Sequence, residues 1–359
     1  MKAFNDVLTD PVYVKQTTPD TAIQRFFKSL IRDERDLPFV YLTIEISLTL
    51  LPLAILLYMP VATWLWWVFA IAYQFLNNFR YKGPFGLMLH CTSHRVFFKK
   101  EYGLLNRYLP WVIGPLFGQT PESYYTHHIG MHHPENNLAE DESTTMPYQR
   151  DSLRDFSAYL TVFIFTGVIT VVRYLFRKNR HKLAVKCARG ELLFIAACVG
   201  LSFINFPATL VVFILPYAIS RVIMMVGNFA QHAFISESDP GNEYKNSITC
   251  INTKYNHKCW NDGYHISHHI KPSMHWTEHP VYFRKTLNEY IENEAIVFDG
   301  IHFLHVWLWL MGKRYDLLAK HFVNIGNRYN SDEDVIAFLK QRTKKINPDK
   351  FPVVSTAAA

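Results

Sequence analysis

Three histidines lie within five residues of one another in the segment WNDGYHISHH, residues 260–269 of a 359-residue chain. They are His265, His268 and His269. If the segment is helical, the i, i+3, i+4 spacing turns two of these imidazoles toward one side of the helix and places the third next to them. A neutral imidazole is a common metal ligand in proteins. The spacing therefore predicts a metal site.

Two other segments follow the same pattern. The segment GLMLHCTSH places His90 and His94 four residues apart, about one helical turn. The segment THHIGMHH repeats the arrangement with His128, His132 and His133, and His127 stands directly before them. A single pair of this kind is often a pair of solvated histidines on a helix surface. Three such clusters in a chain with 17 histidines favour metal ligands.

The number of histidines bears on the number of metal ions. Eight clustered imidazoles are more than one tetrahedral ion can bind, which predicts two ions. Imidazole binds zinc, copper, iron and nickel, so the ligand type alone leaves the metal open. A ninth ligand is expected from the segment GNFAQH, where His232 follows Asn228 by four residues. Asn228 is expected to contribute directly or through a water molecule.

The composition is typical of a multi-pass membrane protein. Hydrophobic residues make up 49% of the chain and aromatic residues 15%, and they gather in long uncharged runs. The net charge of +7 is interpreted as membrane topology, because no basic segment interleaved with aromatic residues indicates nucleic acid. The five cysteines form no CxxC pair, which predicts reduced thiols and argues against zinc-ribbon, rubredoxin and iron–sulfur sites. The N-terminal sequence MKAFNDVLTD lacks the apolar core of a signal peptide, so the first membrane helix is expected to direct insertion.

Two helical hairpins are predicted to cross the membrane. Residues 39–58 would form a helix of about 30 Å, enough to span a bilayer. Pro60 turns the chain, and residues 61–79 return with three tryptophans suited to the membrane interface. Residues 192–220 are uncharged and are broken at residues 205–207, NFP, so they predict the second hairpin.

The uncharged residues 156–172 are a further candidate for a crossing. A crossing there would place the second and third histidine clusters on opposite sides of the membrane. We therefore expect this segment to lie in the interface or to dip in and return. Residues 177–189 carry six basic residues and no acidic one, which indicates a cytosolic loop, whereas both predicted hairpin turns lack Lys and Arg. Both termini and every histidine cluster are then cytosolic.

Three regions are expected along the chain: a cytosolic N-terminal lead-in at 1–38 with an amphipathic turn or two, a membrane catalytic domain at 39–285, and a cytosolic or interfacial helical segment at 286–359. Within the second region, Pro110 and Pro115 break residues 101–126, which favours interfacial or re-entrant packing. Within the third, residues 298–311 are apolar but too short to span, so an interfacial helix is predicted.

The segments HCTSH, HIGMHH and HISHH, with NFAQH between the second and third, resemble the histidine boxes of the membrane fatty acid desaturase and hydroxylase superfamily. The resemblance covers roughly residues 40–285. It implies an all-α integral membrane fold, with four transmembrane helices in two hairpins, interfacial helices and a cytosolic helical cap that carries the boxes. It also implies a di-iron centre with nine ligands: His90, His94, His128, His132, His133, His232, His265, His268 and His269. Because His127 precedes His128, the choice between these two stays open.

The activity that the resemblance implies is O2-dependent oxidation of a fatty acyl chain. Desaturation is the leading interpretation. Oxidative decarboxylation of a free fatty acid to a terminal alkene, and hydroxylation of a fatty acid or alkane, use the same scaffold. A zinc-dependent membrane hydrolase or receptor is a remote alternative, and it would need fewer histidines and no electron donor. A metal transporter would need ligands at mid-membrane, whereas these clusters flank the predicted spans.

Partners of the site are also expected. The chain has no GxGxxG, no HPGG of a fused haem domain and no cysteine cluster, so the electrons should come from a separate protein resembling cytochrome b5 or a ferredoxin. The basic residues 177–189 are a hypothetical docking face for it. Carboxylates that accept the second N–H of a ligand imidazole are expected among Glu122, Glu135, Asp141 and Asp262. The membrane is either a bacterial inner membrane or the endoplasmic reticulum.

Overall fold

The computed structural model describes residues 1–4 and 7–351, which are mostly helical. The chain forms two compact units, each assembled from separated stretches of sequence. Unit 1 comprises Met1–Val12, His128–Tyr174 and Ile223–Ala359, and unit 2 comprises Tyr13–His127 and Leu175–Val222. The first histidine cluster therefore belongs to unit 2, and the second and third belong to unit 1.

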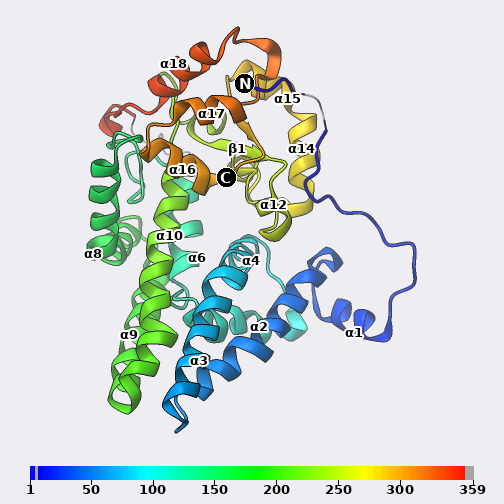
Figure 1. The fold of residues 1–359 in the computed structure, drawn as a ribbon, viewed down its shortest axis with the longest axis vertical. Coiled ribbons are helices and arrows are strands. Elements are labelled where there is room, and N and C mark those ends of the chain that lie inside the picture. Colours follow the sequence, from blue (N-terminus) through cyan, green and yellow to red (C-terminus); the bar gives the residue numbers. More distant parts are fainter. Residues whose placement is uncertain (5–6, 352–359) are drawn as a thin grey trace. The chain divides into compact units, whose positions relative to one another are not determined.

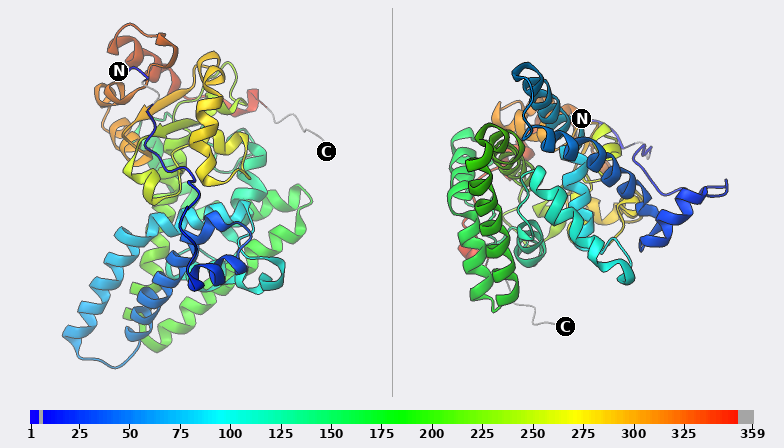
Figure 2. Two further views of the ribbon diagram at one scale, coloured as in Figure 1. Left: turned by 90° about the vertical axis from the view of Figure 1, so that its right-hand side faces the viewer. Right: turned by 90° about the horizontal axis from the view of Figure 1, so that it is seen from below.

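Unit 2 begins with a short helix and an apolar hairpin. The helix α1 (Ala22–Leu30) is capped by Thr21, whose side chain accepts a hydrogen bond from the Gln24 N–H, and it confirms the expected amphipathic turns. The helix α2 (Leu37–Leu56) has a proline in its first turn, where no N–H partner is lost. The helix α3 (Thr63–Phe75) lies beside α2 after the turn at Pro60, as the sequence predicted (Figures 1 and 2).

The returning helix carries the first histidine cluster. A π-helical turn (Leu76–Tyr81) joins α3 to α4 (Lys82–His94), so His90 and His94 lie in the last turns of one long rod. The next residues form only short pieces: a 3-10 helix (Lys100–Arg107), a π-helical turn (Leu109–Ile113), α5 (Gly114–Leu116) and α6 (Ser123–His127). The absence of a long helix in this described stretch agrees with the effect expected of its prolines.

The second apolar hairpin is bent where the sequence predicted a break. The helix α9 (His181–Thr209) contains a non-helical residue at Asn205, with φ −156° and ψ 94°, and the Asn205 side chain caps the next turn by accepting from the Ala208 N–H at 3.1 Å. A π-helical turn (Leu210–Ile214) and α10 (Leu215–Gln231) follow. In unit 2, the buried Tyr73 hydroxyl of α3 donates to the Val212 carbonyl at 3.0 Å, which ties the two hairpins together.

Among the described residues, three helical stretches are long and apolar enough to cross a membrane: Glu34–Leu56, Leu153–Arg177 and His181–Gln231. The last has 51 residues, which is enough for two passes of about 20 residues each. The second is α8 (Leu153–Arg177), one helix of 25 residues. An unbroken helix cannot enter the bilayer and return on the same side. The expectation that residues 156–172 could dip into the membrane and return is therefore wrong, whereas a position in the interface stays a prediction. The four-span topology itself remains a prediction.

Unit 1 contains a small sheet that the sequence pattern did not predict. The strands β1 (Ile248–Ile251) and β2 (Ile296–Asp299) pair in parallel with Ile248 opposite Ile296. Helices α16 (Phe303–Met311), α17 (Tyr315–His321) and α18 (Asp332–Arg342) pack with the sheet around a shared apolar core (Figure 1). The single interfacial helix expected at 298–311 is therefore wrong at its start, because Phe298 is a buried strand residue and the helix begins only at Phe303.

Short helices complete unit 1. They are α7 (His133–Glu135), α11 (Glu243–Asn246), α12 (Lys254–Lys258), α13 (His265–Ile270), α14 (His279–Lys285) and α15 (Leu287–Glu292), with 3-10 turns at Trp276–Glu278, Ile325–Asn327 and Pro348–Lys350 and at Glu34–Asp36 in unit 2. The first residues of the chain also belong here, since the Lys2 N–H donates to the Phe322 carbonyl at 2.8 Å. The described part of the lead-in at 1–38 is thus divided between the two units.

Candidate metal centre

Seven of the nine predicted ligands lie in unit 1, on short pieces of helix. The second cluster occupies a π-helical turn (His128–His132) that runs into α7, and the third cluster occupies α13. The ninth predicted ligand, His232, follows directly after the last residue of α10. All of these side chains except His133 are buried, although histidine is usually exposed or half-buried. Burial of so many imidazoles calls for a chemical reason.

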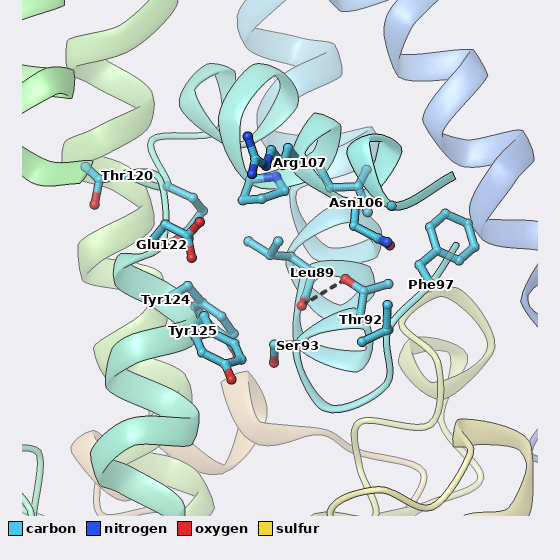
Figure 3. Close-up of a pocket in the computed structure, with 15 residues that line it drawn as sticks. Leu89, Thr92, Ser93, Phe97, Asn106, Arg107, Thr120, Glu122, Tyr124 and Tyr125 are labelled. Atoms are coloured by element: carbon cyan, nitrogen blue, oxygen red, sulfur yellow. Dashed lines mark hydrogen bonds between the residues drawn. The ribbon is translucent and has the colours of Figure 1, made fainter. Parts of the chain in front are cut away.

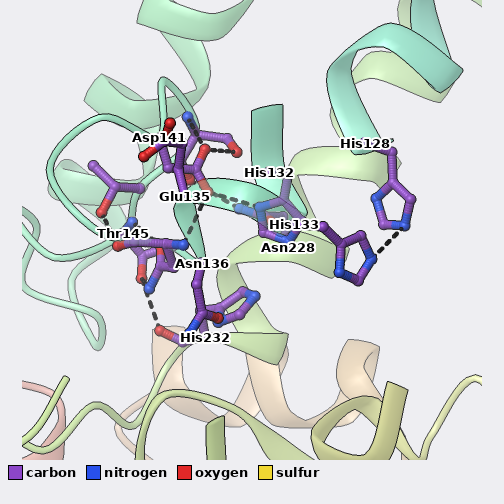
Figure 4. A network of polar contacts seen from close by, with 12 residues as sticks. His128, His132, His133, Glu135, Asn136, Asp141, Thr145, Asn228 and His232 are labelled. Atoms are coloured by element: carbon purple, nitrogen blue, oxygen red, sulfur yellow. Dashed lines mark hydrogen bonds and ion pairs between the residues drawn. The ribbon is translucent and has the colours of Figure 1, made fainter. Parts of the chain in front are cut away.

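The ring nitrogens of unit 1 converge at two places. In the first, His133 Nε2 lies 3.1 Å from His128 Nε2 (Figure 4). It also lies 2.9 Å from His268 Nε2. The second place brings together His132, His232, His265 and His269, with one nitrogen from each ring within 4.8 Å of the others. Its closest approaches are 3.2 Å between His265 Nε2 and His232 Nε2, and 3.1 Å between His269 Nε2 and His265 Nε2.

These distances fit ligands that share an ion. With metal–nitrogen bonds of about 2.0–2.1 Å, neighbouring nitrogens around one ion stand roughly 2.9–3.4 Å apart. Hydrogen bonds alone explain the convergence poorly, because a neutral imidazole has one donor and one acceptor, and two lone pairs that face each other repel. Each of the two places can therefore hold a metal ion.

Hydrogen bonds outside the cluster orient two of the rings. His132 Nδ1 donates to the Asp141 carboxylate at 2.7 Å, which makes Nε2 the ring nitrogen that can act as a metal ligand (Figure 4). Asp141 is held in turn by the Ser143 backbone N–H at 2.8 Å and the Asn137 N–H at 3.1 Å. His232 Nδ1 donates to the backbone carbonyl of Asn246 at 3.0 Å, with the same consequence for its Nε2.

Burial favours the neutral form of two of these imidazoles, those of His232 and His269. It lowers the pKa of His232 far below its usual value, and the neighbouring His132 adds to this effect. The pKa of His269 is also lowered well below the usual value, by burial first and then by His265 and His133. Neutral imidazole is the form that binds a metal ion, so the site is prepared for ligation near neutral pH.

The remaining candidates belong to unit 2 or make other contacts. His90 and His94 are in unit 2, one turn apart in α4, with ring centroids 5.2 Å from each other. His128, and not His127, contributes to the nitrogen groups found among the described residues. The Asn228 amide nitrogen donates to the Tyr159 hydroxyl at 2.7 Å, and its expected cofactor contact stays a prediction.

The model of the protein family described as Fatty acid desaturase matches residues 62–300, which is more than half of the chain. The chain belongs to the fatty acid desaturase family. Comparisons with curated proteins and with solved structures gave no match. Membership implies an oxidoreductase that acts on fatty acyl chains, and the histidine groups of this family member are compatible with a metal site.

Asp141 is the carboxylate that the structure places against a histidine ring of this desaturase-family chain. The other three expected carboxylates make different contacts. Glu135 is buried and accepts a hydrogen bond from the Tyr174 hydroxyl. Glu122, in unit 2, accepts from Trp111 Nε1 at 3.2 Å. Burial raises the pKa of Asp262 to about 7, so this carboxyl is partly protonated near neutral pH.

Other residues of this family member support the third box. The buried Asp10 accepts a hydrogen bond from the Tyr264 hydroxyl at 2.7 Å, directly before His265. Ser267 Oγ lies 2.7 Å from His279 Nδ1 and so links the middle of α13 to the start of α14. The position of His279 just after the box was a usable signal. Asp10 stands 254 residues from Tyr264 and gave none.

Proposed function

We propose that this chain is an O2-dependent di-iron fatty acyl desaturase. The observation that carries the proposal is the convergence of histidine nitrogens, most of them from buried side chains, at two adjacent places in a member of the fatty acid desaturase family. Two ions with all-histidine ligands suit iron, because imidazole is a common iron ligand and oxidation of a methylene needs a redox-active metal.

The nine histidines divide into two ligand sets in this proposal. One ion would be held by His90, His94, His128, His133 and His268, and the other by His132, His232, His265 and His269. Within unit 1 the proposed division rests on the nitrogen distances. For His90 and His94 it rests on their spacing in α4 and on the histidine-box resemblance.

The reaction must balance in electrons and protons. Conversion of one CH2–CH2 unit to CH=CH with reduction of O2 to two waters takes up two electrons and two protons from outside the substrate. Bound iron would supply activation of O2. Burial favours the neutral form of His232 and His269, and hydrogen bonds to Asp141 and to the Asn246 carbonyl orient His132 and His232. The electrons are proposed to come from a separate donor that resembles cytochrome b5 or a ferredoxin, because the sequence carries no second redox motif.

The proposed setting is a bilayer with both termini and the histidine boxes on the cytosolic side. The apolar helix α2 and the 51-residue stretch His181–Gln231 support membrane insertion, and α8 is proposed to lie in the interface. The orientation rests on the basic residues 177–189 and on the lack of Lys and Arg in the predicted hairpin turns.

Product analysis tests the reaction. Cells that make the full chain are compared with cells that make His268→Ala, and their fatty acids, hydroxy acids and volatile alkenes are measured by mass spectrometry. The proposal expects a new double bond that needs O2 and is lost in the variant. A matched control is His257→Ala, which removes an exposed histidine from α12 and should leave the product unchanged.

The other outcomes are equally specific. A hydroxylated acid or a terminal alkene shortened by one carbon would replace desaturation by another oxidation on the same scaffold. Hydrolysis that persists without O2, in a protein that contains a single zinc, would contradict the oxidase proposal altogether.

A further inference from the structure

Unit 2 contains two neighbouring cavities that the histidine boxes do not account for. The first has a volume of about 320 Å³ and lies against α4. The second has a volume of about 490 Å³ and lies between α9 and the short helices that precede α6. Arg107 and Glu122 line both cavities, so the two spaces adjoin.

The walls of the first cavity combine apolar side chains with polar ones such as Asn106 and Gln119. Leu89, Leu109 and Phe97 are among the apolar residues on its walls, and Tyr124 lines it opposite Ser93 (Figure 3). Ser93 and Thr92 come from α4 and stand between His90 and His94 in the sequence. The cavity therefore reaches the turn of α4 that presents the first histidine box.

The second cavity is cationic. Arg107, Lys186 and Arg189 line it together with the single carboxylate of Glu122, so its formal charge is +3 − 1 = +2. Lys186 and Arg189 are three residues apart in α9 and therefore share a face of that helix. Concentration of one sign of charge in a concave site raises the local concentration of ligands with the opposite charge.

The one carboxylate in the second cavity is already engaged. Glu122 accepts from Trp111 Nε1 at 3.2 Å and lies 3.8 Å from Lys186 Nζ. Arg189 stacks over the Trp111 ring, with its Cζ 5.6 Å from the ring centroid. Within residues 1–4 and 7–351, neither Arg107 nor Arg189 forms an ion pair with a carboxylate. Their guanidinium groups are free to receive an anion in the bidentate geometry that arginine favours.

We propose that the second cavity binds the anionic head of the substrate while the acyl chain extends through the first cavity toward His90 and His94. The inference rests on the proposed fatty acyl activity and narrows its substrate class to acyl chains that carry a carboxylate or a phosphate. It also gives Lys186 and Arg189, which the sequence analysis had placed in a docking face for the electron donor, a role in substrate binding.

Equilibrium binding to the purified full chain tests this inference without turnover. The probes are radiolabelled octadecanoic acid, octadecanol and octadecanoyl coenzyme A, and a phospholipid vesicle with octadecanoyl chains. Because charged hydrogen bonds to the guanidinium groups form only with an anionic head, the acid or the coenzyme A ester should bind at least about tenfold more tightly than the alcohol. Preference for the acid identifies a carboxylate head, preference for the coenzyme A ester identifies a soluble phosphate-bearing carrier, and preference for the vesicle identifies a lipid head group.

Variants connect the preference to the cavity. Arg107→Gln/Arg189→Gln should bring the charged probes down to the affinity of the alcohol and leave the alcohol unchanged, whereas Arg107→Lys/Arg189→Lys should keep part of the preference. Lys182→Gln removes a charge from α9 one turn before Lys186, outside both cavities, and should have no effect. Because Arg189 covers Trp111, Arg107→Gln alone serves as a second variant that disturbs no packed ring.

Equal binding of the charged and neutral probes by the unchanged chain would overturn the inference. So would an equal loss in Lys182→Gln, or a double variant that binds every probe normally and loses only its response to the electron donor. Failure of the proposed function looks different: the charged probes would still bind through Arg107 and Arg189, but no oxidised product would form.

Discussion

Asp141 determines which nitrogen of His132 faces the other imidazoles. Its carboxylate accepts from His132 Nδ1 and is itself fixed by the backbone N–H groups of Asn137 and Ser143. A hydrogen-bonded carboxylate of this kind selects the ring tautomer and raises the basicity of the ligand. The effect of this single side chain on metal retention can be measured.

Replacement of Asp141 by Asn should weaken iron binding by about 10–100-fold, because the amide no longer supports the correct tautomer of His132. The measurement is iron retained after titration with a chelator. Ser143→Ala is the matched control, since it removes only the hydroxyl that donates to Asp141 at 2.6 Å and should cause a smaller loss. Iron retention in Asp141→Asn equal to that of the unchanged chain would show that the carboxylate has no part in the site.

The lowered pKa values of His232 and His269 predict acid sensitivity of the metal-free protein. Below the usual histidine pKa of about 6.5, His232 and His269 bind protons in the unfolded chain but stay neutral in the folded chain. The free energy of unfolding should therefore fall as the pH decreases from 7.5 to 5.5. Thermal unfolding of the chelated protein at several pH values measures it. His232→Gln should reduce the dependence, the exposed His257→Gln should preserve it, and a melting temperature that rises toward pH 5.5 would contradict the assignment.

At the scale of elements, α9 packs closely against the turn before α6 in unit 2. A Cβ on Gly190 would lie 1.7 Å from the Pro121 carbonyl oxygen, a distance that forces the helix to move. In contrast, a Cβ on Gly200, further along the same helix, would meet no atom within 4 Å. These two glycines separate the effect of packing from the effect of helix propensity.

Gly190→Ala should lower the free energy of unfolding by at least about 1–3 kcal/mol through overpacking. Gly200→Ala should leave it unchanged or raise it by about 0.5–1 kcal/mol, because alanine favours the helix. Thermal stability of the two variants in the same detergent provides the comparison. Equal melting temperatures would mean that α9 does not approach Pro121 as closely as the structure shows.

Local patterns explain what the sequence predicted well. The histidine spacings, the break at Asn205 and the prolines near Pro110 all act within one or two helical turns, so each is legible from neighbouring residues. The strands ITCI and IVFD were missed because runs of four residues, three of them apolar, are too short to show a period, and their pairing joins segments 48 positions apart. The contact of His232 with the Asn246 carbonyl is made by a backbone atom and leaves no signature in the sequence.

At the scale of the whole molecule, the proposed orientation places two exposed segments on opposite sides of the membrane. They are the turn between α2 and α3 and the loop of unit 1 that contains Ser238. In a background without cysteines, Met59→Cys marks the turn and Ser238→Cys marks the loop; both native side chains are exposed. A membrane-impermeant maleimide should label Ser238→Cys from the cytosolic side and Met59→Cys only from the other. Labelling of both from the same side would contradict the orientation derived from the basic residues.

The central claim is that histidines distant in sequence hold two iron ions, and metal analysis of the purified full chain tests it most directly. Inductively coupled plasma mass spectrometry should find about two iron ions per chain, because the histidine nitrogens gather at two places that can each hold one ion. His232→Ala and His268→Ala, one from each proposed ligand set, should each lower the iron content. One zinc ion per chain, or a metal content unaffected by both substitutions, would contradict the account.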